Sequence, residues 1–355
     1  MDAKLRVLVV GCGNMGASHA RAYQKHANFE IVGLVSRGDS KKKLGAELGI
    51  NSLYDDFDRA LTVTKPDAVC IATYPDTHVS MAIQAMEANC HVFLEKPVGV
   101  TMEEVDRVFA CARKTGRKLL VGYILREHPV WQKFIQAARS LGTPLVMRMN
   151  LNQQSFGSHW KTHQALLAST LSPIIDCGVH YVDVMCQMTD ASPVRVHAVS
   201  ARLTPDIVPE AYNYGQLQVT FSDGSVGWYE AGWGPMMSEC AYFVKDVVGP
   251  GGAVTIENRT AAHSDDVDSH TGTSCLRIHH SELDNSGDFI FDDDIVDVSD
   301  AWHQELCERE QERFYRVIAE DQDMSTHWRQ VRDSMRIVFA ADESCRSGEV
   351  VHLVD

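Results

Sequence analysis

The chain has 355 residues, which at roughly 150 residues per domain predicts two domains or one large one. Hydrophobic residues make up 45% and charged residues 23%, so disorder, collagen and coiled coil are excluded as its main architecture. The formal net charge of −15 repels nucleic-acid phosphates, and the basic run 41–43 is too short to form a binding patch. We therefore expect no nucleic-acid partner.

The N-terminus and the cysteines indicate a compartment. Met1-Asp2-Ala3-Lys4 leads directly into an apolar strand, without the long apolar run and cleavage site of a secretory signal. No stretch approaches the roughly 18–20 apolar residues of a membrane span. The 10 cysteines form no Cys-x-x-Cys pair and lie mostly inside apolar segments, as buried free thiols do. We expect a cytoplasmic protein with no membrane association, disulfide framework or structural zinc site.

The first 123 residues alternate between strand and helix patterns. Near-continuous apolar segments typical of buried strands lie at 5–10, 30–36, 68–72, 91–94 and 118–123. Helical patterns separate them, at 14–26, 77–88 and 102–114. This alternation predicts an α/β domain over 1–123, with a doubly wound parallel sheet covered on both faces.

The rhythm changes after Tyr123. A helical pattern covers 129–140, and longer strands are predicted at 145–151, 194–203, 215–221 and 225–232. Further extended chain is expected at 245–256, around the glycines and proline of 249–252. The turn Ser222-Asp223-Gly224 predicts a hairpin. We expect hairpins and loops in the acidic stretch 257–294, and closing helices at 302–319 and 326–344. Residues 124–355 should therefore form an α+β domain with an open, mostly antiparallel sheet, its C-terminal helix packing back on the first domain.

A glycine motif, Gly11-Cys12-Gly13-Asn14-Met15-Gly16, follows the first strand and opens the first helix. In this context Gly11 allows the tight turn, Gly13 lets the backbone approach a pyrophosphate, and Gly16 lets the helix pack closely. The N–H groups of Gly13, Asn14 and Met15 then face the phosphates. The alternative is a glycine turn without a ligand.

The second strand ends in Ser36-Arg37, where NAD-preferring folds usually carry an acidic residue for the ribose 2′-hydroxyl. A hydroxyl and a guanidinium suit a 2′-phosphate, so we expect an NAD(P)(H) cofactor with a preference for NADP(H). The alternatives are a ribose held by Ser36 or Asp39, which would permit NAD, and an Arg37 that only stacks on the adenine.

Two further motifs carry a family resemblance: Ala72-Thr73-Tyr74-Pro75-Asp76-Thr77-His78, and Glu95-Lys96-Pro97. Together they resemble the glucose-fructose oxidoreductase, inositol dehydrogenase and rhizopine-catabolism family, Gfo/Idh/MocA. The resemblance implies an N-terminal Rossmann domain and a catalytic Lys96. It also implies further cofactor contacts from Thr73, Tyr74, Pro75, His78, Glu95 and Lys96.

The segment Asp176-Cys177-Gly178-Val179-His180-Tyr181-Val182-Asp183 matches the family's Asp-x-Gly-x-His-x-x-Asp motif. Positions i, i+4 and i+7 share one face of a helix, so Asp176, His180 and Asp183 are expected to project together. A carboxylate and an imidazole in a cleft are suited to general acid/base work. The resemblance implies that His180 is the acid/base, that Asp176 orients it or a neighbouring hydroxyl, and that Asp183 is structural.

Candidate substrate residues follow from the crossover segment after the first domain and from a polar, aromatic cluster. They are Tyr123, Arg126, His128, Gln153, His159, Trp160 and Lys161. For Trp160 the alternative is simple packing. His159 and His163 have metal-ligand spacing, but no carboxylate motif accompanies them, so we predict no metal.

The resemblance implies an NAD(P)-dependent dehydrogenase that reversibly oxidises a secondary hydroxyl of a sugar, glycoside or polyol, with C3 of a glucoside as one candidate position. One alternative is a glycoside hydrolase that retains NAD and acts through a transient 3-keto sugar. Another is a non-catalytic redox sensor, which the presence of Lys96 and His180 disfavours. An open sheet needs a cover, and the resemblance implies another subunit's sheet, in a homodimer or homotetramer.

Overall fold

The computed structural model describes residues 4–169, 171–238, 244–257, 275–298 and 301–353. The chain divides into two compact units. The first comprises Met1–Ile124 and Gln304–Arg332, and the second comprises Leu125–His303 and Asp333–Asp355. The first unit therefore also contains Gln304–Arg332, which the predicted domain boundary between residues 123 and 124 places in the second domain.

Six parallel strands form one sheet in the first unit, in the order β3-β2-β1-β4-β5-β6. The strands are β1 (Leu5–Val10), β2 (Phe29–Val35), β3 (Leu53–Tyr54), β4 (Ala68–Ile71), β5 (His91–Glu95) and β6 (Leu119–Gly122). The connecting helices are α1 (Asn14–Lys25), α2 (Ser40–Leu48), α3 (Phe57–Thr64), α4 (Pro75–Glu87) and α5 (Met102–Thr115). This is the strand order of the doubly wound dinucleotide-binding fold, so the predicted parallel sheet is confirmed.

Local sequence signals explain these elements. Every residue of β4 is buried, as expected for a central strand covered on both faces. The carboxylate of Asp56 and the hydroxyl of Thr101 cap the N-termini of α3 and α5, and Gly49 and Gly116 end α2 and α5 in the left-handed region. The boundaries of α5 agree with the helix predicted at 102–114, whereas α2, α3 and the short strand β3 were not predicted.

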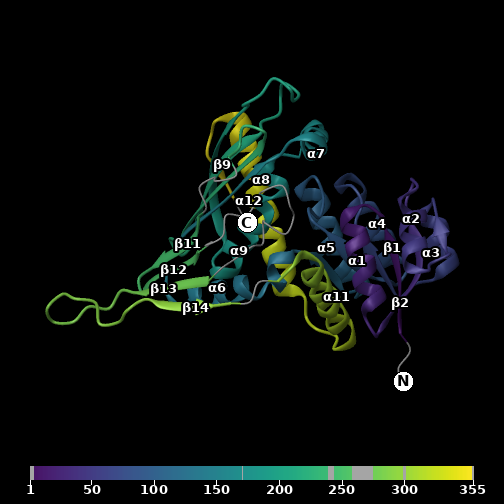
Figure 1. The fold of residues 1–355 in the computed structure, drawn as a ribbon, viewed down its shortest axis with the longest axis horizontal. Coiled ribbons are helices and arrows are strands. Elements are labelled where there is room, and N and C mark those ends of the chain that lie inside the picture. The colour runs from purple at the N-terminus through teal and green to yellow at the C-terminus, as the bar shows by residue number, and fades with distance from the viewer. Residues whose placement is uncertain (1–3, 170, 239–243, 258–274, 299–300, 354–355) are drawn as a thin grey trace. The chain divides into compact units, whose positions relative to one another are not determined.

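Helix α11 (His303–Ala319) completes the core of the first unit (Figure 1). Phe314 and Val317 on α11 pack in one buried cluster with Val7, Tyr23 and Phe29. The helix α12 (Ser325–Ser347) begins in the same unit and continues into the second. The predicted closing helices are therefore confirmed, each within three residues of its predicted bounds.

The second unit contains a nine-stranded sheet in the order β14-β13-β12-β11-β7-β10-β9-β8-β15. Its neighbours pair antiparallel except β7 and β10, which are parallel. The strands are β7 (Val146–Gln154), β8 (Pro193–Ala201), β9 (Tyr214–Phe221), β10 (Val226–Gly234), β11 (Lys245–Gly249), β12 (Gly252–Glu257), β13 (Cys275–His280), β14 (Asp294–Asp297) and β15 (Val351–His352). The open, mostly antiparallel sheet and the hairpin at 222–224 are thus confirmed.

Helices cover one face of this sheet. They are η1 (Ile124–Glu127), α6 (Pro129–Ser140), α7 (Gly157–Ala168), α8 (Pro173–Asp176) and α9 (Gly178–Met188), of which α6, α7, α8 and α9 contact the strands. Met147, Met149 and Tyr229 point toward them and are fully buried. Val146 and Val226 point to the opposite side, which we call the open face, and are 42% and 39% exposed.

Three sequence expectations need correction or restriction. The helix expected through 176–183 is interrupted at Cys177, and the region 157–168, for which no element was predicted, is helical. Of the acidic stretch 257–294, residues 258–274 lie outside the described residues. The described remainder includes the end of β12, β13 and, as predicted, a hairpin connection from β13 to β14.

Among the described residues, we find no helix that has both the length and the apolar character to cross a membrane. The nine described cysteines are free thiols, of which eight are buried and Cys345 is half-buried. The prediction of buried free thiols is confirmed for these nine, whereas Cys240 lies outside the described residues.

Candidate active site

The turn between β1 and α1 combines two packed glycines with one open one. Gly11 has a φ of +93°, and a Cβ there would lie 2.1 Å from the Ala72 carbonyl oxygen. A Cβ on Gly16 would lie 1.9 Å from the carbonyl oxygen of Gly11. A Cβ on Gly13 would meet no atom within 4 Å. Packing therefore demands glycine at 11 and 16, whereas the space beside Gly13 fits a ligand that approaches the backbone.

The N-terminus of α1 suits a phosphate. Gly13 is its N-cap and supplies no side-chain cap, Asn14 is exposed, and the first turn contains no acidic residue. Backbone N–H groups at a helix N-terminus attract anions. The first unit therefore offers a phosphate cradle where the glycine motif predicts one.

Replacing Gly13 by valine is expected to weaken dinucleotide binding about 10- to 100-fold, the equivalent of one or two charge-assisted hydrogen bonds. The melting temperature should hardly change, because Gly13 has a φ of −77° and open space around it. Gly16→Val is the contrasting variant and should destabilise the fold. Calorimetric titration and thermal unfolding measure both effects, and unchanged dinucleotide affinity in Gly13→Val would contradict this assignment of the turn.

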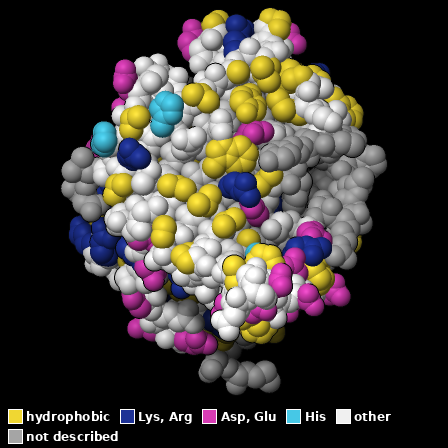
Figure 2. Space-filling view, turned by 90° about the vertical axis from the view of Figure 1, so that its left-hand side faces the viewer, with side chains coloured by type: hydrophobic (Ala, Val, Ile, Leu, Met, Phe, Trp, Pro, Cys, Tyr) yellow, Lys and Arg dark blue, Asp and Glu magenta, His cyan; other side chains and the backbone are white. Residues whose placement is uncertain are grey.

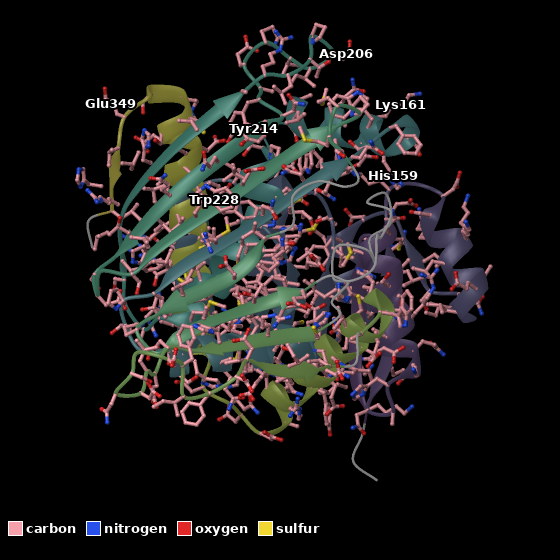
Figure 3. All side chains as sticks on the ribbon, turned by 60° about the vertical axis from the view of Figure 1, so that its left-hand side comes forward. His159, Lys161, Asp206, Tyr214, Trp228 and Glu349 are labelled. Carbon is pink, nitrogen blue, oxygen red and sulfur yellow. The ribbon has the colours of Figure 1, made fainter. Side chains whose placement is uncertain are left out.

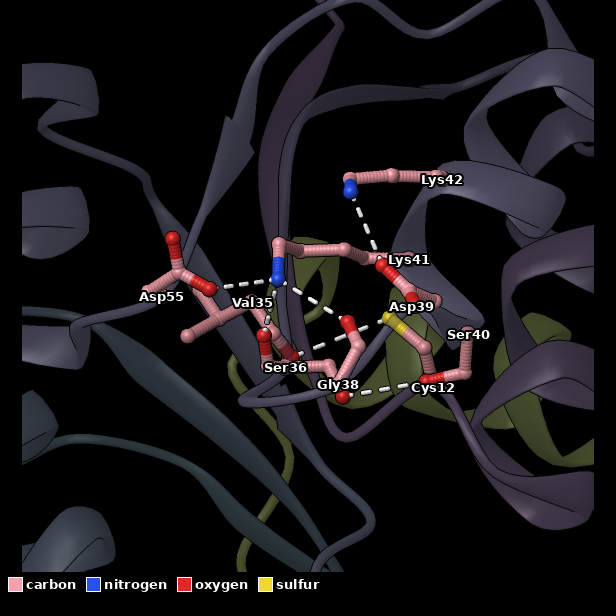
Figure 4. Close-up of polar contacts among 9 residues, drawn as sticks. All are labelled: Cys12, Val35, Ser36, Gly38, Asp39, Ser40, Lys41, Lys42 and Asp55. Carbon is pink, nitrogen blue, oxygen red and sulfur yellow. Dashed lines mark hydrogen bonds and ion pairs between the residues drawn. The ribbon is translucent and has the colours of Figure 1, made fainter.

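The loop after β2 is built around a buried lysine, as Figure 4 shows. The Nζ of Lys41 donates to the carbonyl oxygens of Ser36, at 2.7 Å, and Gly38, at 2.9 Å. It also pairs with the carboxylate of Asp55 at 2.5 Å, and Lys41 is only 6% exposed. Lys41 therefore shapes the loop and is not an exposed cation that could face a phosphate.

The second carboxylate of this loop is also engaged. Lys42 donates to Asp39 at 2.8 Å, and this hydrogen bond lowers the pKa of Asp39 (Figure 4). Ser36 is half-buried with its Oγ 3.1 Å from Ser40 Oγ, and Arg37 is exposed. The end of β2 thus presents a hydroxyl and a guanidinium, while both nearby carboxylates are paired with lysines.

The ends of β4 and β5 are joined through His78, which is 1% exposed. Its Nδ1 lies 2.8 Å from the Pro97 carbonyl oxygen and its Nε2 lies 3.2 Å from that of Thr73. Burial lowers the pKa of His78. Tyr74, beside Thr73, is 68% exposed, and Pro75 opens α4. The imidazole of His78 thus holds the Thr73 turn against the Lys96–Pro97 segment, whose peptide bond is cis.

A buried hydrogen-bond chain leads to Glu95. The side-chain amide of Gln311 donates to His19 Nδ1 at 3.0 Å, so Nε2 carries the proton that His19 donates to Glu95 Oε1 at 2.6 Å. The other oxygen of Glu95 accepts from the backbone N–H of Lys96 at 3.2 Å. His19 and Gln311 are fully buried and Glu95 is 5% exposed, whereas Lys96 is half-buried. The chain therefore anchors the backbone at Lys96.

In the second unit, the predicted Asp176–Asp183 helix is two helices. Ser172 caps α8, which ends after one turn at Asp176, and α9 starts at Gly178. A Cβ on Gly178 would lie 2.8 Å from the Tyr229 ring, so the chain approaches β10 closely at the break. The three side chains differ in burial, since Asp183 is 1% exposed whereas Asp176 and His180 are half-buried, and their common face stays a prediction.

A polar and aromatic cluster surrounds the break. Gln153 Oε1 accepts from Trp233 Nε1 at 2.7 Å and from Cys177 Sγ at 3.2 Å. The ring of His163 stacks on Trp233 with centroids 4.3 Å apart. Burial lowers the pKa of His163 to about 4, against an opposing effect of Asp176, so this imidazole is neutral at pH 7. The cluster can offer hydrogen bonds and an aromatic surface, as sugar-binding sites do.

The three candidate residues around the crossover are buried. Arg126 is 6% exposed and forms a bidentate ion pair with Asp183, at 2.8 and 2.5 Å. His128 is fully buried, and its Nδ1 caps α6 by accepting from the Val130 N–H at 3.2 Å. Tyr123, which follows β6 in the first unit, is 2% exposed. In this structure Arg126 and His128 hold the second unit together.

The cluster predicted at 159–161 does not share one surface. His159 and Lys161 are exposed on α7 (Figure 3). Trp160 is 9% exposed and packs in a core cluster with Leu167 and Trp233. Consecutive residues of a helix point about 100° apart, so Trp160 faces inward while its neighbours face solvent. The packing alternative for Trp160 is the one that the structure supports.

The sequence patterns did not indicate several residues of the hydrogen-bond networks described above. The position of His19, three residues after Gly16 and four before Tyr23, on the buried stripe of α1, is a signal that could have found it. Trp233 and Gln311 carry no such signal. Lys245 is a buried lysine whose Nζ donates to the Asn150 carbonyl oxygen and lies 4.9 Å from the Tyr181 ring centroid. Burial lowers the pKa of Lys245 to about 7.

Among the described residues, one group of three side chains has the donor types and spacing of a metal site. His19, Cys307 and Glu310 each place a donor atom within 4.8 Å of the others, all buried in the first unit. Both ring nitrogens of His19 already hydrogen-bond to Glu95 and Gln311, so a metal would have to displace one of these bonds. His159 and His163, which have ligand spacing in the sequence, do not belong to this group.

Comparisons with known proteins cover both units. Residues 5–123 match a family model described as "Oxidoreductase family, NAD-binding Rossmann fold", and residues 133–244 match the GFO/IDH/MocA C-terminal domain. The UDP-N-acetylglucosamine 3-dehydrogenase of Acidithiobacillus ferrooxidans is 29% identical over 57% of this chain and 60% of its own. The D-glucoside 3-dehydrogenase of Escherichia coli is 28% identical over 51% and 53%. The chain spans about half the length of the curated relatives it matches.

Solved structures share the fold along the whole chain. Scyllo-inositol dehydrogenase from Lactobacillus casei, solved with NAD(H) and scyllo-inositol, superimposes with a TM-score of 0.78 over 98% of this chain and 99% of its own, at 18% identity. An oxidoreductase from Agrobacterium radiobacter, solved with NAD+, L-tartaric acid and magnesium, gives 0.79 over 99% and 98%, at 17% identity. With both family models matched in sequence order, the chain belongs to the Gfo/Idh/MocA oxidoreductase family.

Proposed function

We propose that this protein is an NAD(P)-dependent dehydrogenase that oxidises a secondary hydroxyl of a sugar, glycoside or polyol to a ketone, reversibly. One observation carries the proposal. Three adjacent parallel strands, β1, β4 and β5, end in the open glycine turn, the Thr73–His78 turn and the anchored Glu95-Lys96-Pro97 segment. Ligands of such sheets bind at the carboxyl ends of the strands, so cofactor contacts and the lysine belong to one edge.

The proposed roles follow from the chemistry of each side chain. The nicotinamide, when bound, supplies the hydride acceptor. Lys96 would hydrogen-bond the reacting oxygen, and a nearby cationic ring lowers the pKa of a lysine, so Lys96 can pass a proton. His180 would take the hydroxyl proton as general base, and Asp176 would orient His180 or a neighbouring hydroxyl. Gln153, His159 and Lys161 are proposed to contact the substrate.

The proposed substrate class rests on the relatives, whose names specify UDP-N-acetylglucosamine, D-glucoside and inositol dehydrogenases. A glycoside hydrolase acting through a transient 3-keto sugar is not favoured, because these relatives are named as dehydrogenases. We further propose that 1–123 binds the dinucleotide, that 124–355 binds substrate, and that the open face pairs with that of a second copy. Figure 2 supports the last point, since hydrophobic side chains run across this side of the molecule between charged ones.

The direct test uses protein as purified, without added cofactor. Denaturation followed by mass analysis identifies any retained dinucleotide, and absorbance of the reduced nicotinamide is followed with glucosides, inositols and UDP-N-acetylglucosamine. We expect turnover with at least one of these when NADP or NAD is supplied. Absence of dinucleotide binding would refute the proposal, and glycoside cleavage without net reduction would revive the hydrolase.

The cofactor preference has its own test at Arg37. We propose a preference for NADP(H), because Arg37 is exposed at the end of β2 while Asp39 and Asp55 are paired with lysines. Arg37→Ala should raise the Kd for NADP about 10-fold, the loss of one charge-assisted contact, and change that for NAD less than 2-fold. Lys43→Ala, a neighbouring exposed lysine, is the control. Equal effects of Arg37→Ala on both dinucleotides would indicate stacking on the adenine instead.

A further inference from the structure

The connection between β13 and β14, residues 281–293, is an ordered hairpin that we call the arm. Leu283 and Phe289 form an antiparallel bridge, and the Ile290 N–H donates to the Glu282 carbonyl oxygen at 3.0 Å. At its tip, the carboxylate of Asp284 accepts from the N–H groups of Ser286 and Asp288, at 2.8 and 3.0 Å. Figure 1 shows this segment extending past the ends of the neighbouring strands.

The arm presents large apolar side chains to solvent. Leu283 is 53% exposed, Phe289 60%, Ile290 51% and Phe291 52%. Such a cluster at the end of a projecting hairpin is typical of an interaction surface. The arm lies beyond residue 244, where the match to the family's C-terminal domain ends.

Charge defines what the arm can bind. It contains no lysine, arginine or histidine and has five acidic residues: Glu282, Asp284, Asp288, Asp292 and Asp293. An anionic lipid surface would repel it, and a protein surface with apolar and basic groups would attract it. The far edge of the same sheet offers such a surface, which we call the receiving corner: Val194, 36% exposed, with exposed Arg195 and, opposite it in register, exposed His352.

We propose that the arm of one copy binds the receiving corner of a second copy of this chain. This inference rests on the association of open faces proposed above. One row of the open face links the two sites, running from Arg195 through Thr220, Val226, Val146, Val248 and Ala253 to His279 at the base of the arm. The arm and the corner therefore lie at the same end of the sheet, on opposite edges.

Two-fold symmetry permits two ways of pairing such faces. An axis parallel to the strands exchanges the two edges and brings each arm to the receiving corner of the other copy. An axis across the strands brings the arm to the opposite end of β12 and β14, at Glu257 and Asp297. At that end Glu257 is already paired with Arg277 and Asp297 is exposed, so the arm would meet no unpaired positive charge among these residues. The first arrangement places the acidic arm near Arg195 and His352, so charge favours the first.

The exposed apolar area of the two arms, when wholly buried, reaches the size of a standard interface. Four large apolar side chains that are half exposed offer about 400 Å² per arm. Two arms with the surfaces that receive them bury about 1,600 Å², the size of a standard specific interface.

Sedimentation velocity and light scattering over a range of concentrations test the proposal. Phe289→Ser/Phe291→Ser should raise the dimer Kd about 100-fold or more, whereas Phe156→Ser, a 57% exposed phenylalanine elsewhere in the second unit, should leave it unchanged. Dinucleotide affinity of each variant is measured separately, so failure of the arm is distinguished from failure of the proposed enzyme.

A charge exchange tests the chosen pairing. Arg195→Glu and Asp292→Lys should each weaken the dimer about 10-fold, and the double variant should recover most of the loss. Self-association of the double-serine variant equal to that of the unsubstituted protein would overturn the proposal. So would a protein that remains monomeric at every concentration, or single charge variants without effect.

Discussion

Replacing Lys96 by methionine is expected to lower kcat about 10²- to 10⁴-fold, the usual contribution of a positioned proton-transfer group. Methionine keeps the length of the side chain and removes its charge and its hydrogen bonds. The anchor of this segment uses the backbone N–H of Lys96 and the carboxylate of Glu95, which the substitution leaves in place. Stopped-flow reduction of the nicotinamide, with the dinucleotide Kd determined in parallel, measures the effect.

Lys43→Met is the matched control, because Lys43 is an exposed lysine on α2 in the same unit. We expect its kcat, KM and melting temperature to equal those of the unsubstituted protein. Lys96→Met should retain the melting temperature and bind dinucleotide within a few-fold of normal. Full activity in Lys96→Met would remove the lysine from the mechanism, and loss of folding would show that its contribution is structural.

Breaking the Arg126–Asp183 pair should destabilise the second unit by about 3–5 kcal/mol, because removal of one partner leaves the other as a buried charge. Arg126 and Asp183 are 6% and 1% exposed, and the pair is bidentate. For a unit of this size, Asp183→Ala should lower the melting temperature by about 6–20 °C. Calorimetry and denaturant titration measure the loss.

A surface pair of the same chemistry serves as the control. Arg139 and Asp190 lie 3.6 Å apart with side chains 48% and 82% exposed, so Asp190→Ala should change the free energy of unfolding by less than about 1 kcal/mol. Arg126→Met/Asp183→Leu should recover much of the stability that Asp183→Ala loses, since no charge is then left buried. Equal stability of Asp183→Ala and the unsubstituted protein would show that this pair is already well solvated.

Local patterns were enough to place most elements. The apolar runs and helical periods of the first 123 residues predicted β1, β2, β4, β5 and β6 and the helices α1, α4 and α5, but not β3, α2 or α3. The hairpin at Ser222-Asp223-Gly224 was also predictable, because few backbone conformations connect two antiparallel strands through so short a turn. The glycine motif predicted that a ligand could approach the backbone at Gly13, because each glycine of a strand–turn–helix unit has a defined structural role.

Side-chain roles that depend on distant partners could not be predicted. His19 reaches Glu95 across 76 residues and Gln311 across 292, and Arg126 reaches Asp183 across 57. The break at Cys177 arises where Gly178 meets Tyr229, a contact that helical periodicity cannot register. Trp160 looked like a sugar-binding residue but faces Trp233 in a core.

By itself, the sequence determined the family and the order of most elements, because these depend on spacing along the chain, and it predicted which residues carry the chemistry. Only the tertiary structure decided which polar residues are exposed and which are buried and paired with other side chains. The reason is physical: a buried charge or imidazole must find partners, and those partners come from whichever segments the fold brings together. It likewise decided that the acidic stretch after β13 carries its apolar residues outward on an arm.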